Sequence, residues 1–70
     1  MTEVVAPMVG KVVRIVVAVG DKVEMDDPVV VIESMKMENQ VVAPVSGVIK
    51  EIKVTPGNVV KSGTVMAVIE

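Results

Sequence analysis

The sequence contains no histidine, cysteine, tryptophan, tyrosine or phenylalanine among its 70 residues. Without Cys and His, the chain lacks the thiol and imidazole nucleophile systems and a zinc site of the common Cys and His type. Without aromatic side chains, it has no platform on which nucleobases stack. A chain of this length makes one domain at most and buries only about 60% of its unfolded surface. These absences leave few ways in which the chain could catalyse a reaction by itself.

Charge and hydropathy exclude further classes of function. The 7 basic and 9 acidic residues give a net charge of −2 and are scattered, so no basic patch favours nucleic acid or an anionic membrane. The first ten residues include Glu3 and no basic residue, which is not typical of a secretory signal. The hydrophobic content is 51%, but no apolar run approaches the roughly 20 residues of a membrane helix. We therefore expect a soluble, cytoplasmic protein with no nucleic-acid or membrane partner and no metal site.

The main organising feature is an internal repeat. Residues 4–33 align without a gap with residues 41–70 at an offset of 37, and 12 of the 30 aligned pairs are identical. Composition alone produces some matches among valines, but shared prolines and glycines in one register need another explanation. The pairs of this kind are Pro7 with Pro44, Gly10 with Gly47, and Gly20 with Gly57. The chain is thus two copies of one motif, joined by residues 34–40.

Each copy predicts short strands separated by turns. Val and Ile favour extended backbone, and the segments between them carry Gly, Pro, Asp and Asn. No segment has the caps and the period near 3.6 that predict a helix. The expected strands are 4–6, 11–17, 22–23 and 29–33 in the first copy, and 41–43, 48–54, 59–61 and 65–69 in the second.

Eight such strands are expected to close on themselves. Open edges would template aggregation, and closure buries the apolar faces of both copies against each other. We predict an all-β domain over residues 1–70: a flattened eight-stranded antiparallel barrel or sandwich (a barrel-sandwich hybrid) with a pseudo-two-fold internal repeat and no helix. Its core must be built from Val, Ile, Met and Ala, since no aromatic residue is present.

The connection between the copies, "ESMKMEN" (residues 33–39), holds a lysine between two methionines. The symmetry predicts that the connection, residues 34–40, lies at one pole of the domain and the chain termini at the other. A lysine ammonium is protonated at neutral pH, and acidic neighbours favour that form, so Lys36 is not expected to be a catalytic base. An exposed lysine on a rigid hairpin suits modification by another enzyme. It could equally be a solvated hairpin residue, with Met35 and Met37 filling core space.

This stretch resembles the attachment motif of biotinyl domains, the biotin carriers of biotin-dependent carboxylases, transcarboxylases and decarboxylases, whose usual core is Ala-Met-Lys-Met. The resemblance covers the full chain, because "APMVG" and "APVSG", the "GD" and "GN" turns and the two "VIE" segments fit the two-fold flattened barrel of that family. A Met-Lys-Met triplet alone is weak evidence. Its place between the halves of such a repeat makes the resemblance specific.

The resemblance implies a role for each residue of the motif. Lys36 matches the lysine that a biotin protein ligase joins to biotin through an amide bond. The flanking Met35 and Met37 would help to specify biotinylation, and partial core filling is compatible with that role. Ser34, Glu33 and Glu38 would shape or charge the surface that the ligase recognises. The chain would then be a carrier without catalytic residues, moving carboxyl groups between a biotin carboxylase and a carboxyltransferase or decarboxylase.

Three departures from the family pattern lead to further expectations. Ser34 stands where Ala is commoner, a small change that the ligase should tolerate. "MDDP" lacks the glycine that its repeat partner has at Gly63, so we expect these two turns to differ in build. No insertion interrupts the first copy, so the "thumb" of some bacterial acetyl-CoA carboxylase carriers is absent. That absence favours a carrier for other acyl-CoA or keto-acid enzymes.

Two other functions stay open at this point. Lipoyl carriers of oxo-acid dehydrogenases and of the glycine-cleavage system share this barrel, but their lysine usually follows an Asp, whereas Met35 precedes Lys36 here. A small interaction domain without a prosthetic group is the other alternative. Biotin and lipoate ligases acting on the purified domain would distinguish all three.

Overall fold

The computed structural model describes all 70 residues and consists of eight β-strands with no helix. With no helix present, the chain has none that is long and apolar enough to cross a membrane. The strands are β1 (Thr2–Val5), β2 (Gly10–Ile15), β3 (Lys22–Val23), β4 (Pro28–Ser34), β5 (Met37–Val42), β6 (Gly47–Ile52), β7 (Val59–Val60) and β8 (Val65–Ile69).

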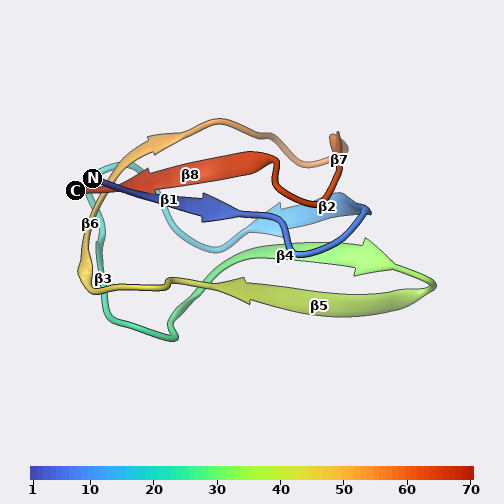
Figure 1. The fold of residues 1–70 in the computed structure, drawn as a ribbon, viewed down its shortest axis with the longest axis horizontal. Coiled ribbons are helices and arrows are strands. Elements are labelled where there is room, and N and C mark those ends of the chain that lie inside the picture. Colours follow the sequence, from blue (N-terminus) through green and yellow to red (C-terminus); the bar gives the residue numbers. More distant parts are fainter.

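The strands form two four-stranded antiparallel sheets, ordered β1-β8-β6-β3 and β5-β4-β2-β7. A shift of 37 residues converts the first sheet into the second, since it takes β1 to β5, β4 to β8, β2 to β6 and β3 to β7. Each sheet therefore takes two strands from each half of the repeat. The two halves are interlocked, as Figure 1 shows, where the blue β1 lies beside the red β8. The predicted fold class is confirmed.

Backbone hydrogen bonds outside the sheets follow the same symmetry. The Gly20 N–H donates to the Ile49 carbonyl at 2.8 Å, and the Gly57 N–H donates to the Val12 carbonyl at 2.8 Å. In the first bond the donor lies in the first half of the repeat and the acceptor in the second, and in the second bond the order is reversed, as a two-fold axis requires. Each of these turns is therefore held by the strand of the other half.

The core lies between the two sheets and is entirely aliphatic. No polar or charged residue is buried. Each of β4 and β8 contributes a continuous buried run, Val29 to Ile32 and Met66 to Ile69. Most of these side chains join one cluster with Val12 and Ile49 of the neighbouring strands. The predicted core of Val, Ile, Met and Ala is confirmed.

The expectation that the "MDDP" turn differs from its repeat partner is wrong. Asp26 has φ 73° and Gly63 has φ 90°, so the same left-handed backbone occurs at both positions. In both turns a side-chain oxygen of the next residue accepts a backbone N–H bond, at 2.9 Å and 3.0 Å (Glu24 to Asp27, Lys61 to Thr64). Asp is among the few residues other than Gly that adopt this conformation with modest strain. The missing glycine therefore leaves the turn unchanged.

Candidate modification site at the β4–β5 hairpin

The predicted connection between the repeats is mostly strand. β5 begins at Met37 and not at the expected residue 41, because β4 and β5 stay paired up to the pair Ser34 and Met37. The same pairing gives β4 one more residue than expected at this end. Only Met35 and Lys36 remain in the turn. The connection is thus a tight two-residue hairpin whose direction is fixed by both strands.

Both residues of the turn adopt left-handed backbone, with φ 56° at Met35 and 64° at Lys36. Positive φ at both central positions defines a type I′ turn, whose twist matches that of the flanking strands. Such turns usually contain Asn and Gly, because a left-handed residue with a side chain costs about 1–2 kcal/mol. The paired strands on either side hold the turn in this conformation. Lys36 is therefore presented at the apex in a defined orientation.

The three side chains at the apex point into solvent. Met35 is 92% exposed, Met37 is 66% exposed, and Lys36 is exposed as well. The interpretation that the methionines partly fill the core is wrong. The hydrophobic cluster ends at Ile32 on β4 and begins again at Val41 on β5, so the hairpin extends beyond the core. Two apolar side chains thus frame the lysine with nothing in this chain to cover them.

Charged side chains lie on the strands below the apex. Glu33 and Glu38 are paired across β4 and β5, and Lys11 of β2 is paired with Glu33. The Arg14 Nη2 atom lies 3.9 Å from the Glu38 Oε1 atom, and both side chains are more than half exposed. Facing carboxylates destabilise a sheet, and the Arg14 guanidinium beside Glu38 offsets part of that effect. An exposed pair of this kind contributes between about 0 and 1 kcal/mol.

The structure places all the sequence-predicted site residues on this hairpin: Glu33, Ser34, Met35, Lys36, Met37 and Glu38. It also brings Lys11 and Arg14 beside them, which the sequence reasoning missed. The repeat gave no signal for this neighbourhood, because it aligns Arg14 with an acidic residue, Glu51. The pairing of β2 with β4 was needed to find it.

The chain termini lie at the other end of the molecule. Figure 1 shows N and C together at the left and the β4–β5 turn at the right, and Thr2 is paired with Ile69. The molecule measures 30 Å along its longest axis, against 19 Å and 18 Å across. The polarity that the repeat predicts is therefore present, with Lys36 at the pole farthest from the termini.

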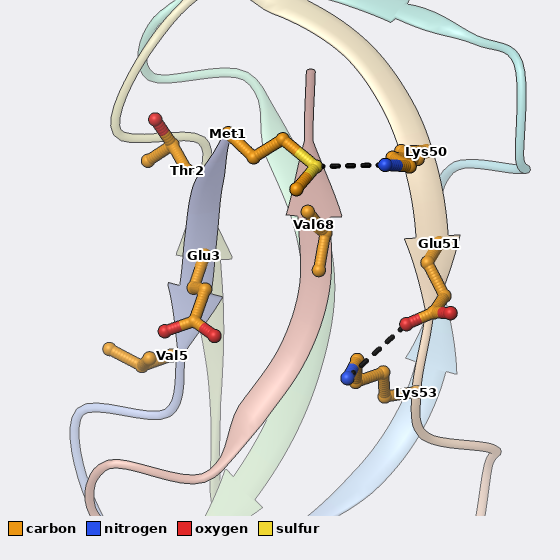
Figure 2. A pocket seen from close by; sticks show the side chains of 8 residues that line it. All are labelled: Met1, Thr2, Glu3, Val5, Lys50, Glu51, Lys53 and Val68. Atoms are coloured by element: carbon orange, nitrogen blue, oxygen red, sulfur yellow. Dashed lines mark hydrogen bonds and ion pairs between the residues drawn. The ribbon is translucent and has the colours of Figure 1, made fainter.

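A separate open groove of about 670 Å³ lies near the termini, over β1, β8 and β6. Figure 2 shows Val68 in the middle of this surface, between charged side chains of the two flanking strands. The Lys53 Nζ atom lies 3.3 Å from the Glu51 Oε1 atom, and the Lys50 ammonium donates to the Met1 sulfur at 2.9 Å. No residue of the hairpin lines the groove. It is therefore not part of the Lys36 site.

Comparison with known proteins gives one family and a consistent set of relatives. Residues 2–69 match the family described as "Biotin-requiring enzyme". The chain is 40% identical over 67 residues to the biotinylated protein TB7.3 homolog of Mycobacterium leprae, covering 96% of this chain and 94% of that protein. It is 45% identical over 60 residues to the biotin carboxyl carrier protein of acetyl-CoA carboxylase of Solanum lycopersicum, covering 86% of each.

Longer proteins contain a similar unit. The chain is 48% identical over 67 residues to the biotin-dependent acyl-coenzyme A carboxylase alpha3 subunit of Mycobacterium leprae, which is 96% of this chain but 11% of that subunit. The crystal structure of the Kluyveromyces lactis urea carboxylase superposes with a TM-score of 0.94 at 38% identity, covering 99% of this chain and 6% of that one. The chain spans only 45% of the biotin carboxyl carrier protein of Streptococcus mutans. The same unit thus occurs as nearly the whole of small proteins and as a small part of large ones.

Proposed function

This chain belongs to the family of biotin-requiring enzymes as a biotinyl domain, and from that premise we propose that Lys36 carries covalently bound biotin. The observation that carries the proposal is the apex of the β4–β5 hairpin, where a single lysine is presented by a tight turn beyond the core. Lys36 is exposed, so its amine is accessible to a second protein. A biotin protein ligase would join the Lys36 Nζ atom to biotin through an amide bond, which removes the positive charge of the side chain.

The chain's own residues position the group and do not react with substrate. The left-handed turn and the paired strands fix where Lys36 leaves the domain, while the lysine stem keeps its rotational freedom. Biotin supplies the chemistry, because its ureido nitrogen carries the carboxyl group. Met35, Met37, Ser34, Glu33 and Glu38 form the surface that we expect the ligase to recognise. We therefore propose a carrier that contributes placement and mobility, and no catalytic residue.

The partners follow from this role. We propose that the carrier takes carboxyl groups from a biotin carboxylase and delivers them to a carboxyltransferase or decarboxylase. The relatives are named as enzymes of both expected kinds, an acyl-CoA carboxylase and pyruvate carboxylase. These relatives support a carrier for an acyl-CoA or keto-acid enzyme, but they do not identify the substrate that receives the carboxyl group. We propose that residues 1–70 act as one domain in this role, and the cytoplasmic location stays a prediction of the sequence.

The test is the mass of the purified protein after co-expression with a biotin protein ligase. We expect a gain of one biotin, which is lost in Lys36→Arg because arginine keeps the charge but forms no such amide. Lys61→Arg is the matched control, since it changes another exposed turn lysine and should keep the gain. A parallel incubation with lipoate ligase tests the lipoyl alternative. Preferential lipoylation, or no gain of mass with active biotin ligase, would refute the proposal.

A further inference from the structure

We propose that Met35 and Met37 form a peroxide-sensitive modification site, and that their oxidation to sulfoxides slows the acylation of Lys36. The inference rests on the proposed function in one respect, because it takes Lys36 as the residue that the ligase acylates. It adds a modification of the neighbouring side chains, with hydrogen peroxide as the oxidant. It also adds a consequence of that modification, a slower attachment of biotin to Lys36.

Only one of the six methionines is buried, and five are exposed: Met1, Met8, Met25, Met35 and Met37. Met66 is fully buried in the core, while Met35 is the most exposed large hydrophobic residue of the chain at 92%. Met37 is also more than half exposed. Oxidation of methionine follows the access of the oxidant to sulfur. Peroxide should therefore reach the hairpin sulfurs in the folded protein and reach Met66 only when the protein unfolds.

The position of the two sulfurs makes their oxidation a local event. They flank Lys36 immediately in sequence, and neither side chain belongs to the hydrophobic cluster. The ladder hydrogen bonds of the hairpin run between backbone groups of β4 and β5, and the Asn39 side-chain amide donates to the Met37 carbonyl, so none of these bonds depends on the sulfur. A sulfoxide at either position should leave the fold intact. Its effect should then be confined to the surface around the amine.

The reaction needs only the named oxidant. A lone pair of the methionine sulfur attacks one oxygen of hydrogen peroxide, an S–O bond forms, the O–O bond breaks, and water is released. The sulfur is oxidised by two electrons, and the peroxide is reduced. The product replaces an apolar side chain with a polar, chiral one that is a hydrogen-bond acceptor. A ligase surface shaped to cover an apolar thioether would bury that acceptor without a partner.

The experiment uses the purified, unbiotinylated protein with and without peroxide treatment. Peptide mass mapping should find one added oxygen at Met35 and at Met37, and none at Met66. The rate of acylation by biotin protein ligase should then fall by at least about tenfold. Treatment with both methionine sulfoxide reductases should restore it. An unchanged rate in protein that is fully oxidised at both positions would overturn the inference.

Variants assign the effect to the hairpin. Leu matches Met closely in volume and does not form a sulfoxide, so Met35→Leu/Met37→Leu should be acylated at the same rate before and after peroxide. Met8→Leu/Met25→Leu removes two other exposed sulfurs and should stay sensitive. Equal peroxide sensitivity in the hairpin variant would contradict the assignment to Met35 and Met37. If the untreated protein is not acylated at all, the proposed function is refuted, and so is the proposed effect of methionine oxidation on acylation.

Discussion

The strained turn at the apex gives the sharpest test of how this fold serves its proposed role. Replacing Met35 and Lys36 with Asn and Gly puts the residues that a type I′ turn prefers at φ 56° and 64°. Each left-handed residue with an ordinary side chain costs about 1–2 kcal/mol. Introducing a glycine also raises the entropy of the unfolded chain, which costs about 0.5–1 kcal/mol. Gly removes the strain at position 36, while Asn removes only part of it at position 35, so the net expected gain in the free energy of unfolding is about 1–2 kcal/mol.

Little stability should be lost in the exchange. Met35 is 92% exposed, Lys36 is exposed, and neither side chain belongs to the core cluster. A gain of 1 kcal/mol in a domain of this size raises the melting temperature by about 4–8 °C. Urea unfolding and a thermal melt of the double variant measure both quantities. The variant should also take up no biotin, because it lacks the lysine.

An alanine variant separates backbone strain from the loss of side chains. Met35→Ala/Lys36→Ala removes the same two side chains but keeps a Cβ atom at both left-handed positions. Its stability should stay close to that of the parent protein. If the Asn-Gly variant is no more stable than the alanine variant, the reasoning from backbone strain is wrong. If the Asn-Gly variant is more stable, the natural hairpin carries backbone strain that other residues would relieve, as is common at functional sites.

Two further predictions concern glycines that the repeat pairs with other positions. An added Cβ at Gly47 would lie 2.5 Å from the Ile69 Cγ2 atom and 2.6 Å from the Glu70 carbonyl oxygen, whereas at Gly10 the nearest atom is 2.9 Å away. Gly47→Ala should therefore lose about 2–3 kcal/mol in urea unfolding, and more than Gly10→Ala does. Gly63→Asp should fold and lose only about 1 kcal/mol in a thermal melt, because Asp26 already holds the equivalent turn. A failure of Gly63→Asp to fold would show that the two turns are not equivalent.

The repeat made much of this architecture predictable. Once residues 4–33 are aligned with 41–70, the number of strands, the β class and the polarity of the domain follow from turn and strand preferences. The apex lysine followed from the same alignment, because it lies in the segment that the repeat leaves over. The boundaries of β5 were less predictable. Its first residues, Met37 to Gln40, have no strong strand preference and become strand because they pair with β4.

Several features of the site required the tertiary structure. The exposure of Met35 and Met37 depends on where the core ends, and the sequence alone is equally compatible with methionines that fill the core. The proximity of Arg14 to Glu38 depends on the pairing of β2 with β4. Such long-range pairings join residues that are distant in sequence, and local preferences carry no information about them.

By itself, the sequence determined that this protein is a duplicated β motif with one unique connection and a lysine at its centre. Its valine-rich strands, its turn residues and its repeat are local or periodic signals, which are visible in the sequence itself. Only the tertiary structure decided that the halves exchange strands between two sheets, that Asp26 replaces a glycine without changing the turn, and that the apex backbone is left-handed. These features depend on hydrogen bonds and packing between distant segments, which become defined only when the whole chain has folded.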